Sequence, residues 1–175
     1  MKFIEYTLEN STKESLQALQ KVQSLYGLIP NLFSYMAEAP ESIHAYIYLN
    51  DVIKASSLSA QEQQIALFTV SHLNGCSFCT GAHRFMGKKA GLNNGIFNAI
   101  QNEELLEEPK FNALVTYVTQ SFEQRGKLSG PQLEAFLQAG FTKKNIFEIN
   151  LIFAIKTLSN YSNHLTQPSL NPEFE

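Results

Sequence analysis

The segment that decides the fold reads Asn74-Gly75-Cys76-Ser77-Phe78-Cys79-Thr80-Gly81-Ala82-His83. The chain has two cysteines, and both lie in this segment, with a histidine four residues after the second. If the Asn-Gly pair breaks the chain and a helix starts near Cys76, the spacing places both thiols and the imidazole along one helix face. The pattern Cys-x-x-Cys-x-x-x-His therefore predicts that Cys76, Cys79 and His83 converge.

Reactive thiols are the chemistry that this convergence favours. A thiol in the first turn of a helix feels the partial positive charge of unpaired backbone N–H groups, and a nearby imidazole can accept its proton. Two other interpretations stay open, because cysteines also pack as small apolar side chains or bind metal. Metal is the weaker of these, since a structural zinc site takes four ligands and the chain has no second cysteine pair. His72 could be recruited, but it lies beyond the Asn-Gly break.

The composition indicates one domain with a sizeable core, since the chain has 175 residues, 44% of them hydrophobic, and 13 phenylalanines. A net charge of −3 with scattered positive residues argues against nucleic-acid binding. No stretch approaches the roughly 20 apolar residues of a membrane span. The first ten residues have no continuous apolar core of signal-peptide type. We therefore expect the cytoplasm, a reducing compartment where a cysteine pair is more often catalytic than structural.

Capping signals divide the chain into helices, with almost no alternating strand pattern. Three motifs, Ser11-x-x-Glu14, Ser59-x-x-Glu62 and Ser129-x-x-Gln132, are typical of helix starts. The expected helices, in chain order, lie at 11–27, 31–39, 41–53, 59–74, 76–91, 93–101, 107–124, 129–140 and 142–165. The sequence thus predicts an all-α, single-domain helical bundle spanning 1–175.

The last expected helix is apolar nearly all round between Ile146 and Ile155. A helix of this kind is buried on more than one side, which in a small domain indicates a subunit interface. We therefore expect a homo-oligomer. The final ten residues contain Pro168 and Pro172 and are expected to form an extended arm.

The segment from Leu58 to Ser71, followed by the Asn-Gly break, the cysteine pair and Ala82-His83, resembles the alkylhydroperoxidase D-like group of the carboxymuconolactone decarboxylase family. The stretch from Phe147 to Leu165 is similar to the family's last helix. The resemblance implies an all-α bundle with its core at 58–165 and a homo-oligomer of trimer or hexamer type. It also implies thiol-dependent reduction of hydroperoxides, with neither metal nor organic cofactor.

The resemblance also implies roles for the residues. Cys79 would attack the peroxide, Cys76 would resolve it as a disulfide, and His83 would handle the proton. An external dithiol or protein reductant would then restore the pair. The spacing agrees for Cys79, which lies four residues before His83. The family's proton-relay glutamate falls at Gln64, whose amide can orient His83 but cannot exchange a proton near neutral pH, so His72 is kept as a possible auxiliary.

Gln64 also favours an alternative function, a non-enzymatic redox sensor or interaction protein that keeps the cysteine pair as a switch. A third interpretation is a decarboxylase or isomerase of the wider family that uses His83 without thiol redox chemistry. Among the remaining candidates, Phe78 and Phe85 are expected to cover the thiols from solvent. His164 is expected to interact with the dipole of the last helix.

Overall fold

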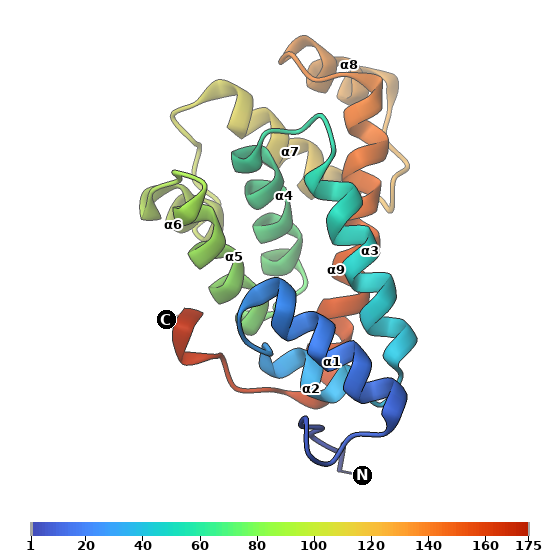
Figure 1. The fold of residues 1–175 in the computed structure, drawn as a ribbon. Coiled ribbons are helices and arrows are strands. Elements are labelled where there is room, and N and C mark those ends of the chain that lie inside the picture. The colour runs from blue at the N-terminus through green and yellow to red at the C-terminus, as the bar shows by residue number, and fades with distance from the viewer. Residues whose placement is uncertain (1, 175) are drawn as a thin grey trace.

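A computed structural model describes residues 2–174, and within this range it is built of helices with no strand (Figure 1). The prediction of an all-α fold is confirmed. The elements, in order, are α1 (Lys13–Tyr26), α2 (Asn31–Met36), α3 (Pro40–Lys54), α4 (Ala60–Leu73), α5 (Ser77–Lys89), α6 (Asn94–Gln101), α7 (Pro109–Glu123), α8 (Gly130–Gln138), α9 (Lys143–Thr166) and a final 3-10 turn, η1 (Pro172–Phe174).

Local capping sets most helix boundaries where the sequence predicts them. At the start of α4, Glu62 N–H donates to Ser59 Oγ at 3.2 Å, and Ser59 N–H donates to Glu62 Oε2 at 2.7 Å. The cap predicted at Ser11 is wrong by one residue. Thr12 caps α1 by accepting from the N–H of Ser15 at 3.2 Å, while the Ser11 hydroxyl bonds backward to the preceding turn.

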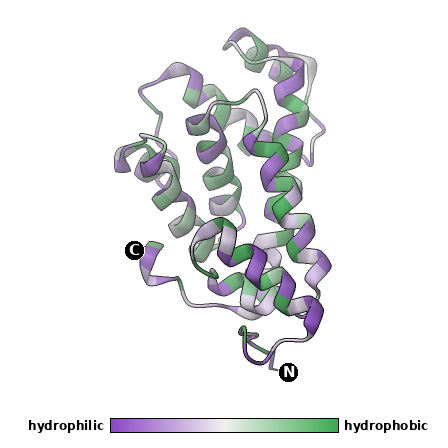
Figure 2. Ribbon diagram, viewed as in Figure 1, coloured by the Kyte–Doolittle hydropathy of each residue, from purple (hydrophilic) through white to green (hydrophobic). Residues whose placement is uncertain are grey.

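Two hydrophobic clusters make up the interior, and the cysteine pair belongs to the smaller one. The larger cluster joins α4, α6, α7, α8 and α9 around Phe68 and Phe97, whose ring centroids lie 4.8 Å apart. The smaller joins α1, α2 and α3 to Cys76 and Cys79. Figure 2 shows hydrophobic and hydrophilic residues interleaved along the helices, as amphipathic packing requires. The thiols therefore lie where the N-terminal helices meet the main bundle.

Helix α9 is buried on one side and apolar on the other. Ile149, Ile152 and Ile155 lie in the larger cluster, whereas Phe147 is 71% exposed and Leu165 is 69% exposed. The expected subunit interface stays a prediction, and the exposed face that Phe147 and Leu165 share is the candidate surface for it. Among the described helices, none combines the length and apolarity needed to cross a membrane.

The expected C-terminal arm is folded back against α2 and α5. Asn31 N–H donates to Asn171 Oδ1 at 2.9 Å, and Asn171 Nδ2 donates to Asn31 Oδ1 at 3.2 Å. Leu170 lies against Gly81 so closely that a Cβ on the glycine would be 2.9 Å from Leu170 Cδ2. Phe174 then packs on Phe85, with ring centroids 5.6 Å apart. Figure 1 shows this segment ending beside α5.

Candidate active site

Cys76 and Cys79 form a disulfide at the start of α5. Their Cα atoms are 5.3 Å apart, within the usual range for a disulfide. Gly75, with φ of 69°, makes the turn that precedes them, and Cys76 is the N-cap residue whose Sγ accepts from the N–H of Cys79 at 3.4 Å. Only 2% of Cys76 and 3% of Cys79 is exposed. The sulfur pair is therefore buried at the positive end of a helix dipole.

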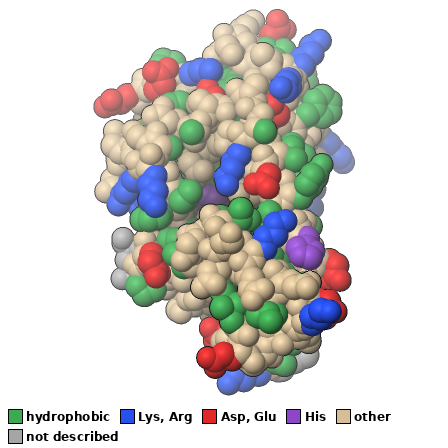
Figure 3. All heavy atoms as spheres, viewed as in Figure 1, with side chains coloured by type: hydrophobic (Ala, Val, Ile, Leu, Met, Phe, Trp, Pro, Cys, Tyr) green, Lys and Arg blue, Asp and Glu red, His purple; other side chains and the backbone are tan. Residues whose placement is uncertain are grey.

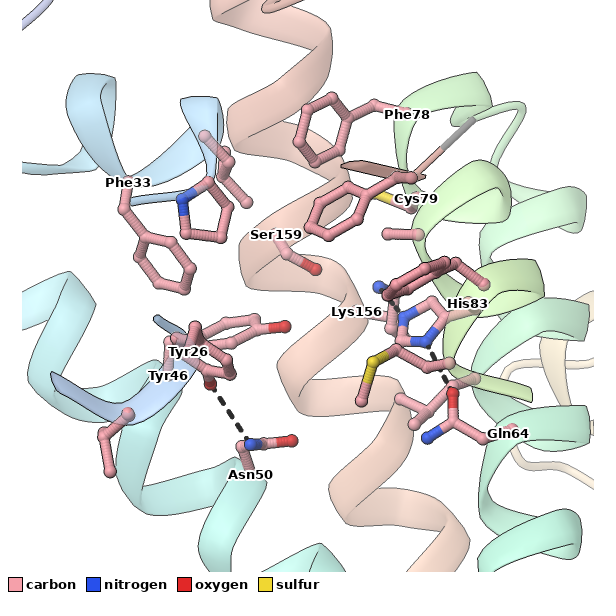
Figure 4. Close-up of a pocket in the computed structure, with 18 of the residues that line it drawn as sticks. Tyr26, Phe33, Tyr46, Asn50, Gln64, Phe78, Cys79, His83, Lys156 and Ser159 are labelled. Atoms are coloured by element: carbon pink, nitrogen blue, oxygen red, sulfur yellow. Dashed lines mark hydrogen bonds between the residues drawn. The ribbon is translucent and has the colours of Figure 1, made fainter. Parts of the chain in front are cut away.

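His83 lies one turn further along α5, between an amide and an amine. Its Nδ1 is 3.1 Å from Gln64 Oε1, and its Nε2 is 2.8 Å from Lys156 Nζ (Figure 4). Because an amide oxygen can only accept a hydrogen bond, Nδ1 carries the ring proton and its N–H donates a hydrogen bond to Gln64 Oε1. Nε2 then presents its lone pair to Lys156. The two neighbours together fix the imidazole in one tautomer.

Lys156 is a buried lysine with no acidic partner. It is 2% exposed, and no salt bridge recorded for residues 2–174 includes it. Burial lowers the pKa of Lys156 from 10.5 to about 7. Burial, and then the charge of Lys156, lower the pKa of His83 well below its usual value. Near neutral pH, His83 is therefore neutral and Lys156 is the group that gains or loses a proton.

Asn163 contacts the second cysteine. Its Nδ2 donates to Cys79 Sγ at 3.2 Å and to the carbonyl oxygen of Ser159 at 2.8 Å, while its buried Oδ1 has no partner within the described residues. Lys156 and Asn163 are seven residues apart on α9, and so share one face of that helix. This face brings an amine to His83 and an amide to Cys79.

A cavity of about 590 Å³ opens between these helices and the N-terminal ones. Cys79, His83, Lys156 and Gln64 line one part of it (Figure 4). Aromatic rings form much of the remaining wall, namely Tyr26, Phe33, Tyr46, Phe78, Phe85 and Phe174. Figure 3 shows a hollow on this side of the molecule. The predicted shielding of the thiols by Phe78 and Phe85 is thus shared with the C-terminal arm.

The structure brings together Cys76, Cys79, His83 and Gln64, and it leaves His72 apart. His72 is half-buried on α4 and does not line the cavity. The short spacing between Cys79 and His83 suggests a direct contact, but no hydrogen bond between them is recorded for residues 2–174, because their polar partners come from α9 and α4.

Lys156 is the site residue that the sequence argument misses. The signal for it is its place in the buried stripe of α9, seven residues after Ile149 and four after Ile152. A lysine at such a position is buried together with the isoleucines of the same helix face, and a buried lysine needs a polar partner. The apolar run from Ile146 ends at Ile155, one residue before Lys156.

Comparison with known proteins supports the resemblance inferred from the motif. Residues 40–101 match the model of the carboxymuconolactone decarboxylase family. No curated protein sequence matches the chain. The fold is similar to that of an uncharacterized peroxidase-related protein from Ralstonia eutropha JMP134, described as an alkylhydroperoxidase AhpD core, with a TM-score of 0.86, 20% identity, and coverage of 99% of this chain and 93% of that one.

Two other solved structures share the fold. A peroxidase-related protein from Silicibacter sp. TM1040 has a TM-score of 0.79 and 17% identity, covering 94% of this chain and 88% of that one. The debrominase Bmp8 has a TM-score of 0.71 and 16% identity, covering 93% and 88%. At these identities the likeness establishes the fold, and the chemistry has to be argued from the residues of this chain.

Proposed function

We propose that this chain, with its carboxymuconolactone decarboxylase segment and its alkylhydroperoxidase-like fold, is a thiol-dependent peroxidase that reduces organic hydroperoxides. One observation carries the proposal. The sulfur of Cys79 is paired with that of Cys76 at a helix start, and Cys79 lines the same cavity as the His83–Lys156 pair. A nucleophile, a resolving thiol and a proton donor thus share one site.

The catalytic cycle begins with the reduced pair. The Cys79 thiolate attacks the terminal oxygen of the hydroperoxide, the O–O bond breaks, and Cys79 becomes a sulfenic acid while an alkoxide leaves. The Lys156 ammonium gives the alkoxide its proton and becomes an amine. The Cys76 thiol then attacks the Cys79 sulfur, water leaves, and the disulfide forms. An external dithiol supplies two electrons to reopen the disulfide, and a proton returns to Lys156.

The residues around Cys79 favour its thiolate. The Asn163 N–H already points at the sulfur, the start of α5 contributes a partial positive charge, and the Lys156 ammonium lies in the same cavity. Gln64 exchanges no proton, but it holds His83 in the tautomer that accepts from Lys156. In this site the proton-holding group is therefore a lysine on α9, in place of a glutamate on α4.

The cavity indicates a bulky substrate. Its volume of about 590 Å³ and its aromatic wall far exceed what hydrogen peroxide needs. Lys54 and Lys89 also line it, with Glu173 as the one acidic residue among the described lining residues. Because aromatic rings form much of the wall, we propose an apolar hydroperoxide, such as one carried on an aromatic ring.

The test is oxidation of the reduced protein by cumene hydroperoxide, followed by counting thiols after rapid quenching. The wild type should lose two thiols, Cys76→Ser should stop at a sulfenic acid that dimedone traps, and Cys79→Ser should lose none. Retained oxidation in Cys79→Ser would contradict the mechanism. Many turnovers with dithiothreitol would support a peroxidase, whereas a single turnover would favour the redox-sensor alternative.

A second candidate function is removal of halogen from an aromatic compound, which the aromatic wall next to Cys79 favours. The net reaction would convert an aryl bromide and two thiols to the arene, bromide, a proton and a disulfide. A structure of the debrominase Bmp8 C82A variant contains 2,3,4-tribromopyrrole, which is a suitable probe. Bromide release by the reduced protein, faster than its oxidation by cumene hydroperoxide, would favour this function over the first.

A further inference from the structure

The two cysteines open onto different cavities. Cys79 lines the cavity of about 590 Å³ already described, and Cys76 does not. Cys76 lines a second cavity of about 540 Å³, to which Cys79 does not contribute. Phe78, between the two cysteines in sequence, is the one described residue that lines both. The other residues of the second cavity are Gly75, Ser77, Asn163, His164, Gln167 and Pro168.

On the basis of the function proposed above, we propose that the second cavity admits the reductant, a small dithiol that attacks Cys76, while the peroxide reaches Cys79 through the first. The two half-reactions would then use opposite sides of one disulfide. The difference in lining supports this division, because aromatic rings dominate the first cavity whereas Ser77, His164 and Gln167 give the second a polar wall.

The chemistry of disulfide exchange selects Cys76 as the attacked sulfur. The attacking thiolate approaches along the extension of the S–S bond, and the exchange is faster when the departing sulfur is the more stable thiolate. Attack at Cys76 releases Cys79, which accepts the Asn163 N–H at 3.2 Å. Attack at Cys79 would instead release Cys76 and would have to come from the aromatic cavity.

Asn163 provides an independent sign of a ligand in the second cavity. Asn163 is 4% exposed, lines the cavity, and keeps its Oδ1 without a partner within the described residues. An unpaired buried acceptor is costly, so a donor on the incoming molecule would be favoured there. The second S–H group of a dithiol is such a donor. Because Cys76 is only 2% exposed, the thiol has to be carried on a small molecule.

The exchange balances in two steps. First, the external thiolate bonds to Cys76 Sγ, the Cys76–Cys79 bond breaks, and Cys79 leaves as a thiolate. Second, the other thiol of the reductant loses its proton and attacks the reductant sulfur that is bonded to Cys76. This closes a disulfide within the reductant and releases Cys76 as a thiolate. The dithiol loses two electrons and becomes a disulfide, and the protein disulfide gains these electrons and becomes two thiols.

Obstructing each cavity in turn tests the proposal. The disulfide is first made with diamide, so the measurement does not depend on peroxide, and its reduction by dithiothreitol is followed by quenched thiol counting. His164→Trp narrows the second cavity and should slow reduction at least tenfold, with oxidation by cumene hydroperoxide within twofold of wild type. The matched control is Met86→Trp, which narrows the first cavity and should leave reduction unchanged. Reduction slowed by Met86→Trp and not by His164→Trp would overturn the proposal.

A second measurement on the wild type needs no substitution. The oxidised protein is pulsed with 2-mercaptoethanol, quenched with N-ethylmaleimide and mapped by mass spectrometry. We expect mercaptoethanol on Cys76 and maleimide on Cys79, and the opposite labelling would overturn the proposal. If the protein reduced no hydroperoxide at all, the function proposed above would fail, while this labelling would still report which sulfur is attacked.

Discussion

At the scale of single residues, the main electrostatic feature of the site is the buried Lys156 beside His83. Lys156 is almost fully buried and its recorded partner is a neutral imidazole, so its charged form is poorly solvated. The resemblance places the family's glutamate at position 64, where this chain has Gln64, and the motif cannot show what else contacts His83. The second polar neighbour of His83, Lys156, comes from α9, far along the chain, and reaches His83 only through tertiary packing.

The first prediction concerns stability and pH. The unfolded chain keeps Lys156 protonated up to its ordinary pKa of 10.5, whereas the folded protein releases this proton near 7. Between these values the unfolded state binds more protons, so this residue makes the free energy of unfolding rise with pH. Lys156→Met should flatten the rise. Urea unfolding of the oxidised protein at pH 6, 7.5 and 9 gives the free energy of unfolding at each pH. If this free energy changed equally with pH in wild type and variant, the shifted pKa of Lys156 would be contradicted.

Lys156→Met should also lower the rate of Cys79 oxidation, because it removes the donor to the alkoxide. General acid–base groups contribute on the order of 10²-fold or more, and a loss of that size is expected with cumene hydroperoxide. Lys156→Arg is the control for charge, since it keeps a cation that does not release its proton near neutral pH. Oxidation at the wild-type rate in the methionine variant would remove Lys156 from the mechanism.

The next prediction adds the missing carboxylate. Gln64→Glu would place a negative charge beside His83 Nδ1, which favours the protonated forms of both His83 and Lys156 and so raises their pKa values. The alkaline limb of the oxidation rate, set by loss of the Lys156 proton, should move to higher pH. Rapid-quench oxidation between pH 6 and 10 measures this limb. An unmoved limb in a correctly folded variant would show that Lys156 does not set it.

At the scale of elements, the sequence predicts what depends on neighbours along the chain. The caps at Ser59 and Thr142 and the left-handed turn at Gly27 are local, and the helices they delimit agree with prediction within a few residues. Contacts between elements are different. The pairing of α5 with α9 and the docking of the arm on α5 depend on side chains that are distant in sequence, so Phe174 enters the site without a local signal.

The arm on α5 leads to a further prediction. Gly81 is packed against Leu170, so Gly81→Val should displace the arm and open the wall that Phe174 forms. The reduced variant should then react faster with a bulky maleimide at Cys79. Gly130→Val is the matched control, because a side chain there meets open space. An unchanged alkylation rate in Gly81→Val would mean that the arm does not restrict access to the thiol.

At the scale of the whole molecule, the outer face of α9 is only partly covered in the single chain. Its apolar positions follow a spacing of four and three residues: Phe147, Ala154, Tyr161 and Leu165 are exposed, whereas Leu151 and Leu158 are half-buried against the two clusters. Tyr48 on α3 is a further exposed aromatic residue, at 70%. In Figure 3, hydrophobic side chains appear along the edge over α3 and α9. A stripe of this period is typical of helices that pack against another helix.

The last prediction is therefore a homo-oligomer that buries this stripe. Phe147→Lys combined with Tyr161→Lys should give a folded, smaller species, because both side chains are exposed in the single chain, at 71% and 56%. Ile149→Asp should instead unfold the protein, since Ile149 is fully buried in the main core and the charge would have no partner. Sedimentation and circular dichroism distinguish the two results. A wild type that sediments as a monomer at micromolar concentration would contradict the prediction, because the exposed stripe would then not mediate self-association.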